Sequence, residues 1–292
     1  MRRGKDLFRP KEYVKPSSVA EAIKLLVHYG EKARLIAGGT DLLVEKDPQI
    51  EVIIDVAGLG LNYIKTDSRG IKIGAATTFA AIEASPALGK SPYGILGEAA
   101  HLMGTPQIRN VATIGGNICS AVPSADSPPA LLALAATLVI AGPTGERTMN
   151  IADFFLDARK NALNRGELVA EIQLPTLPAR MVATFVKKGR LAAADLAVVN
   201  GAVSLIRTTG GLCEDVRIAL GAVAPIPLRT KKAEAMLQGK KPNEDLLRKV
   251  ADCAASEIKP ISDVRGSAEY RRALSRVLVE RMLMDVVASV SG

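Results

Sequence analysis

The sequence predicts an α+β protein made of two unlike parts, and three observations support this. Helix and strand patterns alternate up to about residue 176, whereas beyond it strands come first and helices follow. A proline-spaced segment, LPTLPAR at 174–180, lies between the two regions as a linker would. Apolar residues make up 48% of the chain and charged residues 23%, as in a protein with a substantial core. We therefore expect one domain at 1–176, with subdomains of about 1–57 and 58–176, and a C-terminal α+β domain at 181–292.

The first subdomain reads as a small βαβ-like unit. Residues 17–30 predict an amphipathic helix that a serine caps and that Gly30 ends. ARLIAGG at 33–39 is typical of a short buried strand that runs into a glycine turn. DLLVEK at 41–46 predicts a brief helix, and EVIIDV at 51–56 predicts another strand.

The second subdomain begins with two short strands in residues 63–84, joined by a Ser-Arg-Gly turn and followed by a helix that Thr77 or Thr78 opens. A second helical stretch is expected at 91–104. The motif TIGGN follows with a long loop, and an apolar segment at 130–142 leads into a turn.

The C-terminal domain is expected to start with three alternating strands at 181–189, 197–206 and 215–224, with Gly210 and Gly211 in a hairpin turn. Two capped helices should follow, at 243–258 and 267–290. The last helix is charged on one side and apolar on the other, so it either packs on the domain surface or serves a subunit interface.

Composition argues against several function classes. Three cysteines without a CxxC motif and two histidines do not supply a disulfide framework, an iron–sulfur cluster or a metal site, so we expect no metal in this chain. The net charge of +8 is spread out without interleaved aromatics, which disfavours nucleic acid and suits an anionic ligand or an acidic partner. The longest apolar run, Pro128 to Pro143, falls short of a membrane span, and the N-terminus MRRGKDLFRP lacks a signal core. We therefore expect a cytoplasmic protein.

Two glycine pairs stand out, in LIAGGTDLL (residues 35–43) and in TIGGN (113–117). Glycine permits positive φ and lets several backbone N–H groups converge on one anion, and a helix that starts after the turn adds its dipole. Two such turns suit a diphosphate. The alternative is a pair of ordinary tight turns, with Thr40 or Asp41 as a helix cap. Neither a G-x-G-x-x-G fingerprint before a helix nor a Walker motif is present, which disfavours a Rossmann domain and a P-loop.

Several motifs in order resemble the FAD-binding subunit of the molybdenum hydroxylases, the family of xanthine dehydrogenase and aerobic carbon monoxide dehydrogenase. They are LIAGGTDLL, PQIRNVATIGGNICSAVPSADS, DLAVVNGAVSL, IALGAVAPIPLRTKKAEAML and SDVRGSAEYRRAL. The resemblance covers nearly the whole chain. It implies a two-subdomain FAD-binding domain of the vanillyl-alcohol-oxidase type, followed by a C-terminal domain like that of the carbon monoxide dehydrogenase flavoprotein.

The resemblance also implies which residues contact FAD. Both glycine turns would bind the pyrophosphate, Asp126 would face the flavin or ribityl donors, and Met103 would pack on the cofactor. Lys187 either touches the isoalloxazine or is an ordinary lysine on an exposed strand, because some relatives carry the lysine at the position of Val186. The expected cofactor-binding residues are Leu35, Ile36, Ala37, Gly38, Gly39, Thr40, Asp41, Leu42, Met103, Ile108, Thr113, Ile114, Gly115, Gly116, Asn117, Ala125, Asp126, Val169, Phe185 and Lys187.

The function that the resemblance implies is electron transfer, with no catalytic residue for C–H chemistry in this chain. Electrons would come from a molybdopterin in a large subunit through the two [2Fe–2S] clusters of a small subunit. FAD would pass them to NAD, a quinone or O₂. Two alternatives are an assembly scaffold that no longer holds FAD, and a free-standing FAD oxidoreductase with its own substrate.

Overall fold

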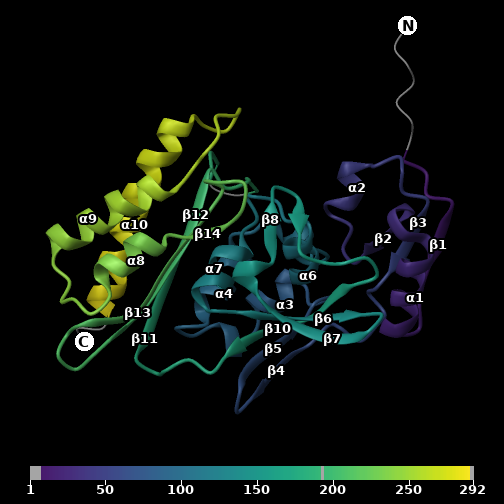
Figure 1. Ribbon diagram of the computed structural model, residues 1–292, viewed down its shortest axis with the longest axis horizontal. Coiled ribbons are helices and arrows are strands. Elements are labelled where there is room, and N and C mark those ends of the chain that lie inside the picture. Colours follow the sequence, from purple (N-terminus) through teal and green to yellow (C-terminus); the bar gives the residue numbers. More distant parts are fainter. Residues whose placement is uncertain (1–7, 192–193, 290–292) are drawn as a thin grey trace, which may run out of the picture.

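The computed structural model describes residues 8–191 and 194–289, so the expected ends at residues 1, 290 and 292 lie outside the described residues. Three blocks follow one another in chain order in Figure 1. A small N-terminal block lies at one end, a mixed block lies in the middle, and a sheet with helices lies at the other end. None of the helices within the described ranges combines the length and apolar character that crossing a bilayer requires.

The N-terminal block is a parallel three-stranded sheet in the order β1-β3-β2. As expected, its main helix α1 (Val19–Tyr29) is capped by Ser18 and ends at Gly30, whose φ of 58° favours glycine. Strand β1 was not predicted, because it has only three residues and two of them are exposed. The other elements are β1 (Glu12–Val14), η1 (Gly30–Lys32), β2 (Ala33–Ile36), α2 (Leu42–Glu45) and β3 (Val52–Asp55).

The middle block holds an antiparallel sheet in the order β4-β5-β10-β6-β7. Its strands are β4 (Ile64–Asp67), β5 (Gly70–Gly74), β6 (Thr137–Gly142), β7 (Gly145–Asn150) and β10 (Leu168–Pro175). The helical segments and a small hairpin of this block are α3 (Phe79–Glu83), η2 (Pro86–Leu88), α4 (Gly94–His101), α5 (Pro106–Arg109), α6 (Ile114–Cys119), α7 (Ser127–Ala133), η3 (Ile151–Asp153), β8 (Phe155–Asp157) and β9 (Lys160–Asn161).

The expected linker at 174–180 needs correction, because its first two residues belong to β10. Leu174 is buried and lies opposite Ile71 in the sheet, and Pro175 ends the strand.

A second finding concerns the apolar segment at 130–142. It divides into the end of α7 and the strand β6, with Ala135 at φ 53° in the connection.

The C-terminal block is an antiparallel sheet in the order β11-β12-β13-β14. Its elements are β11 (Met181–Lys188), β12 (Val199–Arg207), β13 (Cys213–Gly221), β14 (Leu228–Arg229), α8 (Lys231–Leu237), α9 (Glu244–Glu257) and α10 (Ala268–Ser289). Helix α10 packs on β12, β11 and α9 and buries Val279, Met282, Leu283 and Val286, so this face of α10 belongs to the domain core.

The two faces of this sheet belong to different cores. Val199 and Val203 face the helices α8–α10, whereas Ala202 and Phe185 contribute to the core of the middle block. Alternation along a strand explains the division, since neighbouring residues point to opposite faces. The second face therefore covers α7, which contacts both β12 and β13.

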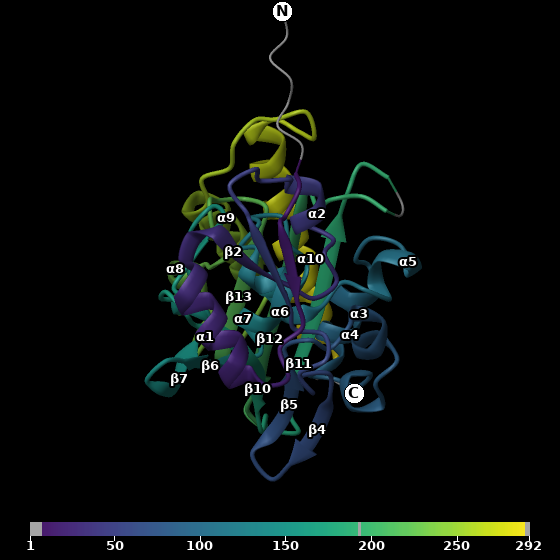
Figure 2. The same ribbon diagram turned by 90° about the vertical axis from the view of Figure 1, so that its right-hand side faces the viewer.

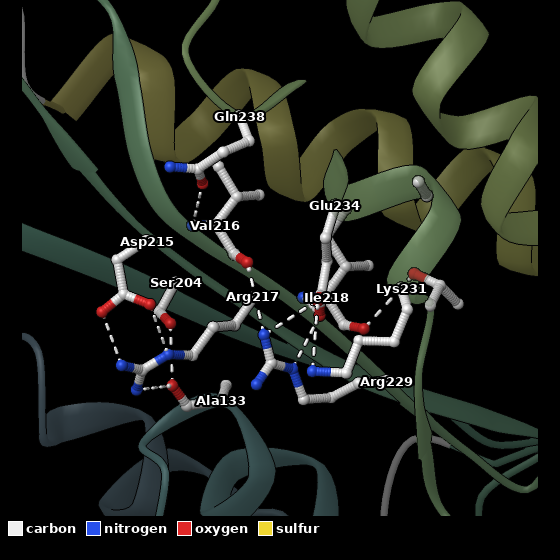
Figure 3. Close-up of polar contacts among 12 residues, drawn as sticks. Ala133, Ser204, Asp215, Val216, Arg217, Ile218, Arg229, Lys231, Glu234 and Gln238 are labelled. Carbon is white, nitrogen blue, oxygen red and sulfur yellow. Dashed lines mark hydrogen bonds and ion pairs between the residues drawn. The ribbon is translucent and has the colours of Figure 1, made fainter. Parts of the chain in front are cut away.

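Polar contacts secure the C-terminal end of α7 against this sheet. Ala133 O accepts hydrogen bonds from Ser204 Oγ at 2.8 Å and from Arg217 Nη1 at 3.1 Å. Figure 3 shows that the same guanidinium is held in place by both carboxylate oxygens of Asp215. A second pair in that view, Arg229 with the buried Glu234, links β14 to α8.

A buried arginine closes the start of α10. Arg271 is 2% exposed and donates to Val198 O, Ala222 O and Asp263 Oδ1 at 2.7, 2.9 and 2.7 Å. Burial opposes ionisation of Asp263, but the backbone N–H of Arg265 and the guanidiniums of Arg271 and Arg265 outweigh it and lower the pKa of Asp263 to about 2.

This pair gives a pH-dependent contribution to stability. Because the pKa of Asp263 is lowered on folding, its contribution is complete above about pH 4 and is lost as the pH falls towards 2. We expect Asp263→Asn to lower the free energy of unfolding by about 2 kcal/mol at pH 6, and the difference from wild type to shrink below pH 4. Urea denaturation at several pH values measures both. Asp245→Asn is the control, since the Asp245 side chain is 83% exposed; a pH-independent difference for Asp263→Asn would contradict the assignment.

Candidate functional site

A cavity of about 1290 Å³ lies between the N-terminal block and the middle block, and one segment of the C-terminal block reaches it. In Figure 2 the N-terminal sheet lies in front of α6 and α7, and residues of both blocks line the cavity. Most of its lining residues fall in the ranges 29–42, 103–126, 159–169 and 194–196, and the others lie at 26, 45–61 and 75–76.

The first glycine turn lines this cavity with its backbone. The turn connects the end of β2 to the start of α2, and Gly39 has a φ of 69°, which glycine adopts without strain. The backbone N–H groups of residues 37–41 donate no hydrogen bond to any group among the described residues. Five consecutive amides are therefore free to bind an anion at the N-terminal side of α2.

Gly38 is required for a different reason, which is close packing. A Cβ on Gly38 would lie 1.9 Å from Val111 O, so no larger residue fits there without moving the backbone. A side-chain bond holds the same two segments together, since Ser120 Oγ donates to Asp41 Oδ2 at 2.7 Å. The first turn is thus fixed against the segment around TIGGN.

The second glycine turn differs from the first, because four of its backbone amides donate to groups within the protein. Thr113 caps α6, and Gly116 N–H donates to Thr113 Oγ1 at 3.2 Å. Gly115 N–H donates to Ala75 O at 2.9 Å, and a Cβ on Gly115 would lie 2.6 Å from that oxygen. Gly115 therefore serves close packing, whereas Gly116 is exposed to the cavity.

Two further amides of this turn are also engaged, since Ile114 N–H donates to Thr77 O and Asn117 N–H donates to Thr113 O. The Asn117 side chain differs. Ser127 Oγ donates to Asn117 Oδ1 at 2.6 Å, which fixes the side-chain amide and leaves Nδ2 without a partner among the described residues. Asn117 therefore offers N–H donors to the cavity.

A buried carboxylate lies in the cavity wall where α7 begins. Asp126 Oδ2 accepts from Lys187 Nζ at 2.6 Å, and Asp126 Oδ1 accepts from Asn200 Nδ2 at 3.0 Å. Lys187 also donates to Leu102 O at 2.9 Å. Burial raises the pKa of Asp126, and the ammonium of Lys187 and the amide of Asn200 oppose that shift.

The structure shows where Lys187, for which two interpretations were open, lies on its strand. Phe185 and Lys187 lie on the face of β11 that covers the middle block, whereas Val186 packs with the C-terminal core. The interpretation of Lys187 as an exposed strand lysine is wrong, because its side chain is 7% exposed. Lys187 reaches the wall through Asp126 and does not itself line the cavity.

Most of the expected site residues lie around this one cavity. Those that line it are Leu35, Ile36, Ala37, Gly38, Gly39, Thr40, Asp41, Leu42, Met103, Ile108, Thr113, Gly115, Gly116, Asn117, Ala125, Asp126 and Val169. Ile114 and Phe185 are instead 0% and 1% exposed within the hydrophobic core and do not line it.

Other lining residues were not anticipated. The segment 29–34 and the cationic side chains Arg159 and Arg165 border the cavity. Arg165 Nη2 donates to Val27 O at 2.9 Å, and Arg159 forms an ion pair with Glu45. No motif surrounds either arginine in the sequence, so only the fold shows that they belong to this site.

The cysteine in the wall is poorly reactive. Burial raises the pKa of the Cys119 thiol to about 12, so it stays protonated near neutral pH. Among the described residues, no three His, Cys, Asp or Glu side chains lie together as metal ligands would.

Comparison with protein families identifies the chain. Residues 8–177 match the FAD-binding domain in molybdopterin dehydrogenases, and residues 184–286 match the CO dehydrogenase flavoprotein C-terminal domain. The chain belongs to the FAD-binding medium subunits of the molybdenum hydroxylases. This medium subunit is an oxidoreductase subunit with FAD as its cofactor.

Relatives extend over the whole medium subunit. It is 35% identical to the glyceraldehyde dehydrogenase medium chain of Sulfolobus acidocaldarius, over 94% of this chain and 97% of the relative. It is 30% identical to the nicotinate dehydrogenase FAD-subunit of Eubacterium barkeri, over 96% and 97%. The structure of carbon monoxide dehydrogenase from Hydrogenophaga pseudoflava superposes with a TM-score of 0.92 at 35% identity, over 97% and 98%. The expected family and fold class are thereby confirmed.

The packing of Gly38 in this medium subunit gives a prediction. Gly38→Ala places a Cβ against Val111 O and forces the first turn away from the TIGGN segment, so we expect the free energy of unfolding to fall by about 2 kcal/mol and bound FAD to decrease. Gly58→Ala is the matched control, because a Cβ there meets nothing within 4 Å and the residue is exposed. Denaturant unfolding and flavin absorbance measure both effects. Equal behaviour of the two variants would show that the close approach is unimportant.

Proposed function

We propose that this chain is the electron-transfer flavoprotein of a three-subunit molybdenum hydroxylase. FAD in the cavity would receive electrons from [2Fe–2S] clusters of a small subunit, which a molybdopterin in a large subunit reduces, and would deliver them to NAD, a quinone or O₂. We place the complex in the cytoplasm. The row of five amides at residues 37–41, unpaired within the described part of the chain, carries the assignment of the cofactor site, since it meets the requirement of a diphosphate.

The pyrophosphate is assigned to the first turn together with the side chain of Asn117. A dianion gains most where several N–H donors converge away from competing charge. The amides of residues 37–41 meet that condition, and Asn117 Nδ2 adds a donor from the other wall. The carboxylate of Asp41 accepts from Ser120 Oγ on the opposite segment, which fixes its position beside the row of amides. The TIGGN segment contributes shape and one side chain to the site.

The flavin end is assigned to the wall that contains Met103, Ala125, Asp126 and Val169. Pockets for drug-sized ligands measure about 300–1,000 Å³, and a cavity of about 1290 Å³ has room for a larger molecule such as a dinucleotide. Bound FAD would supply one- and two-electron chemistry. Lys187 and Asn200 fix the carboxylate of Asp126 in this wall. We assign to it the role of accepting hydrogen bonds from N–H or O–H groups at the flavin end of FAD.

The two alternatives make different demands on the site. A scaffold without FAD has no use for a row of amides left open to a ligand, and the cavity walls retain that row. A free-standing oxidoreductase that takes a proton from its substrate needs a general base near that substrate, whereas the buried carboxylate Asp126 in the wall is paired with Lys187. Both observations favour an electron-transfer subunit.

The Asn117 side chain tests the position of the pyrophosphate. Asn117→Ala removes the fixed donor, so we expect the dissociation constant for FAD to rise about tenfold while the fold is kept. Asn110→Ala is the control, because Asn110 is exposed and lies outside the cavity lining. Titration of the apoprotein with FAD, followed by flavin fluorescence, measures both. Unchanged affinity in Asn117→Ala would move the pyrophosphate elsewhere.

The composition of the complex is tested in the native host. We expect tagged protein to co-purify with one small iron–sulfur subunit and one large subunit, with FAD equal to the amount of this chain and with molybdenum and iron in the complex. Omitting molybdenum from the medium should abolish substrate-dependent reduction of the flavin but leave FAD bound. Turnover of an organic substrate by the isolated chain would instead support the free-standing enzyme, and a complex without flavin would support the scaffold.

A further inference from the structure

The face of β12 that covers α7 carries a row of three fully buried residues, which are Asn200, Ala202 and Ser204. They alternate along the strand and therefore point to the same side. Ser204 Oγ holds the C-terminal end of α7 through Ala133 O at 2.8 Å. Asn200 Nδ2 holds the N-terminal end, through Ala125 O and Asp126 Oδ1, each at 3.0 Å. One strand of the C-terminal domain thus secures a helix of the FAD-binding domain at both ends.

The neighbouring strand β13 leaves the room that the Asn200 side chain occupies. Gly221 lies directly opposite Asn200 in the ladder between β12 and β13. A Cβ on Gly221 would lie 2.2 Å from Asn200 Oδ1, so the side-chain amide occupies space that only a glycine leaves open. The φ of Gly221 is not positive, and steric room is therefore what this position requires.

The orientation of the amide follows from charge. Rotating it by half a turn would aim Asn200 Oδ1 at the carboxylate of Asp126, so the donor Nδ2 must face Asp126. Oδ1 is buried without a hydrogen-bond partner among the described residues, which is unfavourable. The two hydrogen bonds that Nδ2 donates, to Ala125 O and Asp126 Oδ1, offset this unsatisfied oxygen.

We propose that Asn200 is a positioning residue for the cofactor: it locks the carboxylate of Asp126, which lines the cavity, in one orientation. Lys187 engages the other oxygen at 2.6 Å, so the carboxylate is held from two strands of the C-terminal domain and cannot rotate. Asp126 lines the cavity, so its carboxylate lies within reach of a ligand there. This inference rests on the proposed function, in which the flavin end of FAD lies against Asp126.

Loss of Asn200 should have a defined effect on the flavin. Without the Nδ2 donor of Asn200 the carboxylate of Asp126 is held by Lys187 alone and can rotate, so its charge changes position relative to the cavity. The free energy of adding electrons to the flavin depends on the position of nearby charges. We therefore expect the midpoint potential of bound FAD to shift and the affinity for FAD to fall roughly tenfold.

The experiment compares three variants of the complete complex, or of the FAD-loaded chain. Asn200→Leu keeps the volume and removes both donor bonds. Gly221→Ala leaves Asn200 in the sequence but places a Cβ where its side chain lies, so it should reproduce the effect. Ser204→Ala is the matched control, because it removes a bond of the same strand to the far end of α7, where Arg217 still holds Ala133. For each variant the midpoint potential, the visible circular dichroism of the flavin, the dissociation constant of FAD and the melting temperature are measured.

If Asn200 is a positioning residue, the flavin measurements should distinguish the variants, whereas thermal stability should not. All three variants lose some thermal stability, but only Asn200→Leu and Gly221→Ala shift the potential and the flavin dichroism. If Asn200→Leu lowers stability as Ser204→Ala does, while potential, dichroism and affinity stay at wild-type values, the inference is overturned and the proposed function stands. If wild-type protein binds no FAD at all, the proposed function itself fails. Should Asn200→Leu not fold, Gly221→Ala tests the same role by the same criteria.

Discussion

The close approach of two backbone segments is the constraint on which the site depends. Gly38 lies against Val111 O and Gly115 lies against Ala75 O, at distances that exclude any side chain. The first contact brings the turn after β2 to the segment before α6, and the second seats α6 on the strand β5 side of the middle block. Only with both contacts made do the free amides at residues 37–41 face a wall that contains Asn117. The cavity is therefore a product of packing between backbones.

The second constraint on the site is the buried ion pair between Asp126 and Lys187. Asp126 and Lys187 are 6% and 7% exposed, and such a pair is stable only where hydrogen bonds satisfy both partners. Leu102 O and Asn200 supply those bonds. The pair crosses the boundary between the two matched domains, since Asp126 belongs to the first and Lys187 to the second. The C-terminal domain is thus part of the cavity wall, although it contributes few lining residues.

The sequence predicted much of this arrangement, and its failures have physical causes. Long periodic helices with clear caps, such as α1 and α9, were found because local pattern and local structure agree. Strand β1 and the end of β10 were missed, because short or proline-containing strands depend on neighbours far along the chain. The glycine pairs drew attention to the right cavity. Which of the two glycine turns keeps its amides free was not predictable. Amides of the second turn donate to Ala75 O and Thr77 O, and no sequence pattern indicates those acceptors. Arg159 and Arg165 were missed for the same reason.

Support of α7 from both ends has a consequence for how the molecule is made. The residues that hold Asp126 come 61 and 74 positions after it in the chain. A growing polypeptide therefore emerges with its first amide-lined turn long before the strands that steady the opposite wall. The pocket reaches its final form only after β12 has been synthesised and has joined the sheet. Capture of the cofactor in that form is a late event in the biogenesis of the protein.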